Sequence, residues 1–168
     1  NMNIDFLVTE LNLLPHPEGG YYKEVYRSKG VLSKDALEGV FEGERNYCTS
    51  IYFLLTGENF SAFHRLKQDE IWHFYSGQSL YVHEIDAHGN YTRHEVGLDI
   101  SNGQVPQLII PAGSWFGSEV NSSQPNDFSF VGCTVAPGFD FKDFEMPSRE
   151  ELIKLFPQHS AIVQRLTR

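Results

Sequence analysis

The chain has 168 residues and a formal net charge of −9, and these properties exclude several classes of protein. The negative charge disfavours nucleic-acid binding and docking on anionic membranes, because both need a concentrated basic surface. The sequence has neither a signal-peptide pattern nor an apolar run of about 20 residues, so we expect one cytoplasmic domain over residues 1–168.

The first part of the chain predicts a short helix followed by a strand. Apolar residues recur at helical spacing within residues 3–12, and the proline and glycine residues of 15–20 end that helix. The alternating pattern of 21–27 predicts a strand. Residues 28–45 are polar and contain three glycines, which predicts a long loop of the kind that forms lids or stays disordered.

The rest of the chain predicts a mainly β protein. Strand-like runs recur at 46–55, 61–77, 80–86, 91–96, 106–110 and 127–136. A capping box at Ser148–Glu151 starts a helix through Phe156, and 160–167 adds a final amphipathic turn or two. Short strands bracketed by terminal helices indicate a closed jelly-roll barrel. Cys48 and Cys133 fall in strand-like runs, where free thiols are more typical than a disulfide.

The stretch Ser61–Gly77 holds the first candidate for chemistry. His64 and Glu70 lie six residues apart in two apolar runs, with a polar turn between them. Side chains alternate along a strand, so His64 shares a face with Leu66, and Glu70 shares a face with Trp72. If both faces line one cavity, an imidazole and a carboxylate lie close together there, and burial would shift their pKa values.

This stretch resembles the first motif of the cupin superfamily, and Pro111–Phe116 resembles the second. Leu66 and Phe116 stand where two of the usual metal-binding histidines belong, so His64 and Glu70 are the only ligand positions that remain. The resemblance implies a jelly-roll barrel whose interior binds a ligand.

Three further stretches narrow the resemblance. They are His16–Tyr22 with Tyr26–Ser28, Asp69–Tyr75 and Val131–Asp140, and they resemble a cupin family of unknown function described as predicted sugar epimerases. The resemblance covers about Leu11 to Phe144. It implies a single jelly-roll barrel, a homodimer, and a small ligand such as a sugar or nucleotide sugar. The aromatic content of 14% agrees with apolar surface left over for a partner.

The first functional hypothesis is a metal-independent epimerase or isomerase. Its catalytic residues would be His64 and Glu70, which remove a proton next to a carbonyl group. Arg27 would stabilise the enolate. It also needs an anionic partner, which would be a substrate phosphate or carboxylate if no protein acid fills that role. The predicted wall of the site consists of Tyr22, Arg27, Tyr52, Trp72 and Phe116.

Two alternatives remain open. A metal-dependent enzyme needs at least three protein ligands, and His73 would be the third only if a bulge turned it inward. Because two ligand positions are lost, we expect no cofactor and disfavour a divalent metal. The other alternative is a barrel that binds a small molecule without catalysis.

Overall fold

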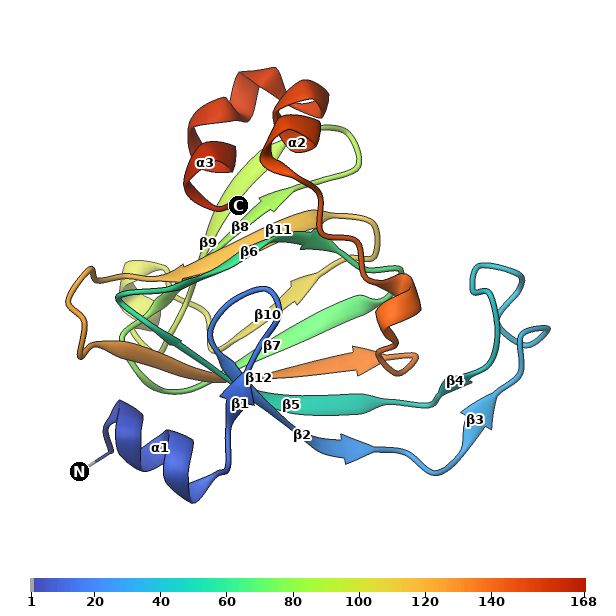
Figure 1. Ribbon diagram of the computed structural model, residues 1–168, viewed down its shortest axis with the longest axis horizontal. Coiled ribbons are helices and arrows are strands. Elements are labelled where there is room, and N and C mark those ends of the chain that lie inside the picture. Colours follow the sequence, from blue (N-terminus) through green and yellow to red (C-terminus); the bar gives the residue numbers. More distant parts are fainter. Residues whose placement is uncertain (1) are drawn as a thin grey trace.

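The computed structural model describes residues 2–168, and its main strands form two facing antiparallel sheets (Figure 1). The larger sheet contains, in spatial order, β1 (Leu14–Pro15), β2 (Tyr21–Arg27), β5 (Thr49–Thr56), β12 (Phe128–Ala136), β7 (Asp69–Gly77) and β10 (Gln107–Ile110). The smaller sheet contains β6 (Phe60–Arg65), β11 (Trp115–Val120), β8 (Leu80–Ile85) and β9 (Tyr91–Val96). Strands that are distant in the sequence are neighbours, as in a jelly roll.

The mainly β, jelly-roll-like fold is confirmed, but the closed barrel is not. Within residues 2–168 no strand ladder joins the two sheets, so β1 and β10 remain edges of one sheet and β6 and β9 edges of the other. An alternating pattern predicts one buried face per strand, and both a sandwich and a barrel satisfy that pattern.

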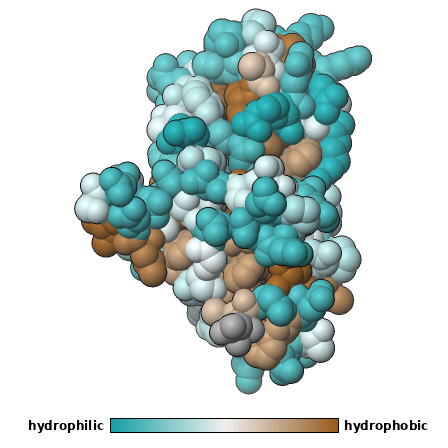
Figure 2. Space-filling model, turned by 90° about the vertical axis from the view of Figure 1, so that its left-hand side faces the viewer, coloured by the Kyte–Doolittle hydropathy of each residue, from teal (hydrophilic) through white to brown (hydrophobic). Residues whose placement is uncertain are grey.

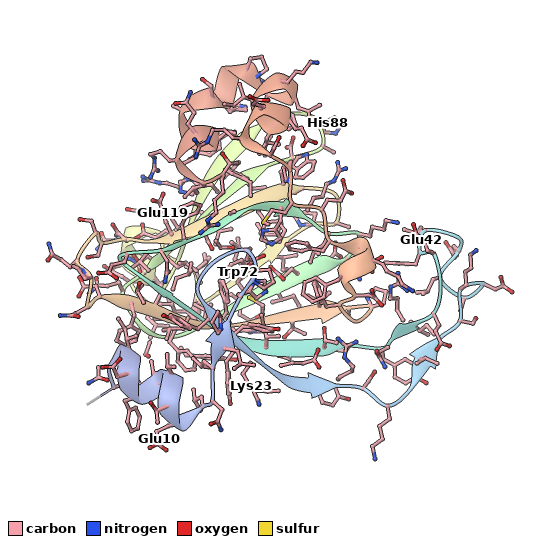
Figure 3. The ribbon with its side chains drawn as sticks, viewed as in Figure 1. Glu10, Lys23, Glu42, Trp72, His88 and Glu119 are labelled. Atoms are coloured by element: carbon pink, nitrogen blue, oxygen red, sulfur yellow. The ribbon has the colours of Figure 1, made fainter. Side chains whose placement is uncertain are left out.

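The main core lies between the two sheets. Its largest member is Trp72 on β7, which is only 1% exposed and packs edge-on against Phe53 and Phe116. Figure 3 shows Trp72 in the interior, whereas Glu10 and His88 lie at the periphery. The remaining buried apolar side chains come from alternate positions of the strands, as the period of two requires.

Helices cover the outer faces of the sheets. The helix α1 (Ile4–Glu10) is capped by Asn3 and packs on the larger sheet through a small cluster with Leu54 and Phe130. The helices α2 (Arg149–Leu155), with its predicted capping box, and α3 (Ser160–Arg165) pack on the smaller sheet. Single 3₁₀ turns are η1 (Ile100–Asn102), η2 (Phe141–Asp143) and η3 (Pro157–His159).

Two segments differ from the sequence prediction. The strand β11 had no predicted counterpart, because its run WFGSEV is interrupted by a glycine and polar residues. The connection 28–45 carries a small ladder of β3 (Val31–Leu32) and β4 (Arg45–Asn46). Arg45 then forms a buried ion pair with Asp143 at 2.8 Å, which fastens this arm to η2.

The surface is mixed in character. On the face seen in Figure 2, hydrophobic side chains are interspersed among hydrophilic ones. No helix between residues 2 and 168 is long and apolar enough to cross a membrane. Both cysteines are free thiols, as predicted; Cys133 is buried and Cys48 is half-buried.

Candidate functional site

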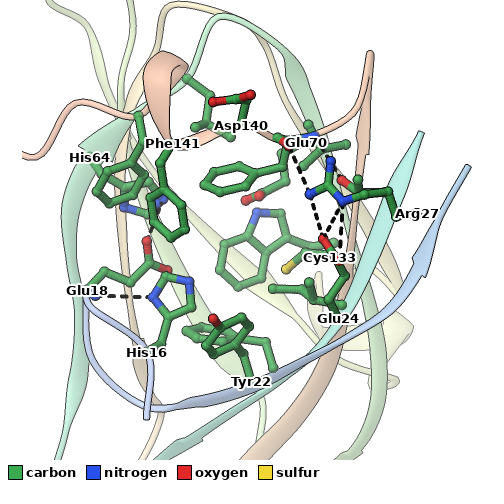
Figure 4. A pocket seen from close by; sticks show the side chains of 18 residues that line it. His16, Glu18, Tyr22, Glu24, Arg27, His64, Glu70, Cys133, Asp140 and Phe141 are labelled. Atoms are coloured by element: carbon green, nitrogen blue, oxygen red, sulfur yellow. Dashed lines mark hydrogen bonds and ion pairs between the residues drawn. The ribbon is translucent and has the colours of Figure 1, made fainter. Parts of the chain in front are cut away.

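A cavity of about 460 Å³ lies against the inner face of the larger sheet (Figure 4). We divide its polar and aromatic lining by exposure and call the two parts the buried end (His16, Glu18, His64 and Glu70) and the open end (Glu24, Arg27, Asp140 and Phe141). Side chains at the buried end are nearly inaccessible, whereas Phe141 is 54% exposed. Aromatic rings line the space between the two ends. The volume and lining match those of small-molecule sites, which span roughly 300–1,000 Å³.

The buried end is built around His64 and Glu18. Nε2 of His64 lies 3.1 Å from Oε2 of Glu18, and both side chains are less than a tenth exposed. Nδ1 of His64 lies 2.7 Å from the carbonyl oxygen of Ala62. A carbonyl only accepts, so Nδ1 donates and carries a hydrogen. Nε2 is therefore the ring nitrogen that can gain or lose a proton, and it faces the carboxyl group.

Burial determines whether Glu18 or Nε2 of His64 carries a proton. It lowers the pKa of His64 to about 4 and raises the pKa of Glu18 above its ordinary value. The 3.1 Å separation would also suit an ion pair, but burial disfavours both of its charges. Burial therefore favours the neutral form of both groups, with a proton on Glu18 and none on Nε2. Oε2 of Glu18 lies 3.1 Å from Nε2, and Oε1 accepts a hydrogen bond from Ser61 Oγ at 2.8 Å.

His16 adds a second oriented imidazole. The backbone N–H of Glu18 donates to Nδ1 of His16 at 3.1 Å, so the neutral ring carries its hydrogen on Nε2. Burial lowers the pKa of His16 and keeps the ring neutral. Its edge contacts with Tyr22 and Phe53 hold the ring in place, with centroids 4.6 and 5.6 Å apart. His16 therefore offers the cavity an N–H donor.

Glu70 lies at the buried end but does not pair with His64 as predicted. Among residues 2–168 no hydrogen bond joins them, and the carboxyl partner of His64 is Glu18. The reason is topological: His64 lies on β6 and Glu70 on β7, in opposite sheets, while the loop with Glu18 reaches β6. Burial, and then the nearby Glu18, raise the pKa of Glu70 well above its ordinary value, so this carboxyl group is a donor.

Arg27 lies at the open end with its partners already in place. Its Nη2 donates to Glu24 at 2.7 Å and to the Phe139 carbonyl at 3.1 Å, and Nη1 donates to Asn46 at 2.8 Å. Arg27 lines the cavity, and the anionic partner that it needs is a protein acid, Glu24, and not a substrate anion. In Figure 4 the Arg27–Glu24 pair lies apart from the group formed by His16, Glu18 and His64.

The other predicted wall residues divide into three groups. Tyr22 and Trp72 line the cavity, together with Leu66. Phe116 does not line it; the ring packs against His64 with centroids 4.1 Å apart and supports the imidazole. Tyr52 points the other way and packs on Tyr75 and Phe130 outside the sheet, so its prediction is wrong. Ile51 and Phe53 take the inward positions of β5, and strand parity excludes Tyr52.

Sequence reasoning missed Glu18 and His16 as site residues. Both lie in the irregular stretch before β2, where strand parity assigns no direction. The signal was the dense run His16–Tyr22, which brings an imidazole and a carboxyl group beside two glycines. Gly19 has a positive φ of 117°, and a Cβ there would overlap the Phe60 carbonyl oxygen. The loop can therefore lie against β6, where the Ala62 N–H donates to the Glu18 carbonyl at 2.9 Å.

The donor set does not suit a metal ion. No group of three or more His, Cys, Asp or Glu between residues 2 and 168 is arranged to hold one. Nδ1 of His16 and Nδ1 of His64 are engaged by backbone groups, and Leu66 stands in the cavity wall where the motif has a histidine. His73 does not turn inward, since its Nε2 lies 3.0 Å from Thr134 Oγ1 on the outer face. The absence of a cofactor in the working protein stays a prediction.

Comparisons with known proteins agree with this architecture. The sequence profile described as Cupin superfamily (DUF985) matches residues 5–147. The uncharacterized protein YML079W of Saccharomyces cerevisiae is 31% identical over 155 residues, which cover 88% of this chain and 77% of that protein.

Two solved structures resemble the whole chain. Protein SO0799 from Shewanella oneidensis is 42% identical, with a TM-score of 0.89 over 100% of this chain and 99% of that one. A hypothetical protein from Leishmania major is 36% identical, with a TM-score of 0.89 over 99% of both chains. None of these names states a reaction, so the site's chemistry has to be argued from its own geometry.

Proposed function

Because the chain belongs to the cupin superfamily, in the family described as DUF985, we propose that it catalyses an epimerase- or isomerase-like reaction on a sugar-like carbonyl compound. The reaction needs no metal and proceeds by proton transfer in the cavity. The observation that carries this proposal is the buried contact between Glu18 and His64, which lie 3.1 Å apart in the wall of a ligand-sized cavity.

Glu18 takes the role of general base. A carboxyl group whose pKa is raised toward the working pH is a more effective base than an ordinary carboxylate. His64, with its pKa of about 4, is a weak base, and its role is to position the carboxyl group. This differs from the sequence prediction, in which His64 and Glu70 remove the proton.

The proposed reaction balances without a co-reactant. Glu18 first releases its proton to solvent, and the resulting carboxylate removes a proton from the carbon next to the substrate carbonyl. The C–H electron pair then forms a carbon–carbon double bond. The carbonyl electron pair moves to its oxygen, which accepts a hydrogen bond from Nε2–H of His16. Protonated Glu70 returns a proton to the other face or to the neighbouring carbon, and Glu18 then passes its proton to Glu70 through solvent.

The test is deuterium exchange. Wild-type protein in D₂O, incubated with free aldoses and ketoses, is expected to introduce deuterium next to the carbonyl group, detected by proton NMR. Glu18→Gln should abolish that exchange, and Glu10→Gln is a control with the same substitution at an exposed position. Exchange that persists in Glu18→Gln would refute the assignment of the base.

A second candidate is ligand binding without catalysis. It is favoured by the aromatic lining, because Tyr22, Phe53 and Phe141 offer a binding surface that needs no proton transfer. Ligand binding without any deuterium exchange would select this candidate.

We also propose that the protein is a homodimer. The outer face of the larger sheet leaves Ile109 and Tyr75 61% and 45% exposed, and exposed apolar groups of this kind commonly meet a partner. Light scattering is expected to give twice the chain mass of 19.2 kDa, and the monomer mass at micromolar concentration would contradict the proposal.

A further inference from the structure

The charges around the cavity are unbalanced. Four carboxyl groups line it, from Glu18, Glu24, Glu70 and Asp140, and Arg27 is the one lysine or arginine among the residues that line it. Histidines add no charge, because burial lowers the pKa of both His16 and His64. Burial likewise favours the neutral forms of Glu18 and Glu70, so the negative groups of the lining are Glu24 and Asp140, and its single cation is Arg27.

That cation is already committed to the protein. A guanidinium group has five N–H donors, and those of Arg27 reach both Glu24 oxygens, the Asn46 side chain and the Phe139 carbonyl. A phosphate group prefers a bidentate pair with an arginine. To make that pair here, it would have to displace Glu24 and leave this carboxylate unpaired beside the new anion.

No other guanidinium replaces it. Arg168 lies near Glu18 but donates to the carbonyl oxygens of Glu18 and Phe60 and stacks on the Phe60 ring at 4.2 Å. It does not line the cavity. Asp140 belongs to the open end, and its carboxylate repels an anion there.

The buried end offers neutral hydrogen bonds instead. Its donors are Nε2–H of His16 and the carboxyl group of Glu70, whose burial raises its pKa. Neutral hydroxyl and carbonyl oxygens satisfy such donors without bringing a charge into a buried space. The aromatic rings between the ends suit the apolar faces of a small ring or chain.

From this arrangement we infer that the cavity selects an uncharged hydroxylated carbonyl compound, such as a free sugar, and rejects its phosphate esters and nucleotide-linked forms. The inference rests on the proposed function for the class of compound, and on the Arg27–Glu24 pair and Asp140 for the charge. Of the two ligands that the sequence resemblance implies, the inference keeps a sugar and excludes a nucleotide sugar.

Calorimetry and saturation-transfer NMR test the selection directly. The probes are glucose, fructose and xylose, a phosphate ester of each, UDP-glucose and glucosamine. We expect at least one free sugar to bind, and its phosphate ester to bind at least about tenfold more weakly. An ester or UDP-glucose that binds as tightly as the free sugar would overturn the inference. So would tighter binding of glucosamine than of glucose, or no binding of any free sugar.

Two variants test whether Glu24 and Asp140 cause the weaker binding of the phosphate ester. Glu24→Gln releases Arg27 and should strengthen binding of the ester at least about fivefold while leaving the free sugar within about twofold. Asp140→Asn, which keeps the hydrogen bond to the Lys142 N–H, should act in the same direction but more weakly. Glu10→Gln makes the same change of charge on α1 and should change neither affinity. An unchanged ratio of ester to sugar affinity in Glu24→Gln would overturn the inference.

The two proposals fail in different ways. Binding of a free sugar without deuterium exchange would leave the ligand class standing and refute the proton transfer. Deuterium exchange on a sugar phosphate that binds more tightly than the free sugar would support the proton transfer and refute the selection of an uncharged ligand.

Discussion

Two buried histidines in this protein each lie beside a glutamate, and the surroundings of the two pairs differ. Nε2 of His64 lies 3.1 Å from Glu18 in the cavity, and no lysine or arginine between residues 2 and 168 donates to that carboxyl group. On the other face of the smaller sheet, Nε2 of His83 lies 2.6 Å from Glu119, and Arg165 of α3 donates two hydrogen bonds to the same carboxylate at 2.8 Å each.

The arginine decides the charge of each pair. Although burial opposes it, hydrogen bonds from His83 and Arg165 lower the pKa of Glu119 to about 2. For Glu18, burial prevails and raises the pKa. The same two residue types therefore form a charged anchor for α3 in one place and a neutral proton-sharing pair in the other. The charged group around Glu119 stabilises the packing of α3, whereas a buried neutral pair such as Glu18 and His64 can take part in proton transfer.

The largest expected difference is in activity. Glu18→Gln should reduce deuterium exchange by about 10²–10⁴-fold, because an amide cannot accept the substrate proton. The melting temperature should stay within about 5 °C, since glutamine has the shape of the protonated carboxyl group that it replaces. Exchange within about fivefold of wild type would show that Glu18 is not the base.

Glu119→Gln should have the opposite effects. The free energy of unfolding, measured with urea, should fall by about 2–3 kcal/mol because charge-assisted hydrogen bonds from His83 and Arg165 are weakened. Deuterium exchange should stay within about twofold of wild type. A loss of exchange at unchanged stability would contradict the division of roles.

The two pairs should also respond to different ranges of pH. Glu119 has a lowered pKa in the folded state, so its contribution to stability is present above 4.5 and is lost as the pH falls toward about 2. His64 also has a lowered pKa, so the unfolded chain binds its proton first and stability falls between pH 6.5 and about 4. Urea unfolding of wild type, His64→Gln and Glu119→Gln across this range should separate the two windows. A single shared window would contradict the comparison.

The smallest expected difference between the two histidine–glutamate pairs is in how salt affects their contributions to stability. Arg165 is 58% exposed, so about 1 M NaCl should screen its attraction to Glu119 and reduce the stability difference between wild type and Glu119→Gln by roughly 0.5 kcal/mol. The buried pair carries no charge and should not respond. An equal salt effect on Glu18→Gln would indicate that Glu18 is ionised.

Local patterns predicted the fold well. Alternation identified β2, β8, β9 and β12, and the capping residues identified α1 and α2. Alternation also predicted that Trp72 and Leu66 point inward, and both line the cavity. The strand β11 was missed because its pattern is weak, and the sheet edges depend on pairing between distant strands.

The site was predicted only where strand parity applies. His64 and Glu70 face the cavity, but which carboxyl group meets His64 depends on how the loop before β2 crosses the interior. For Tyr52 the alternation was recognised and the wrong face was chosen. The pairing of Arg27 with Glu24 crosses only three positions, but a bulge between Glu24 and Tyr26 directs it.

The location of the shared proton is the central claim, and nitrogen NMR of the His64 ring measures it directly. With ¹⁵N-labelled protein, the two ring nitrogens of His64 should show a neutral imidazole protonated on Nδ1, unchanged from pH 8 to pH 5.5, because its pKa is about 4. An imidazolium signal at pH 7, or a transition centred between pH 6 and 8, would place the proton on His64 and contradict the assignment of Glu18 as the group that carries it.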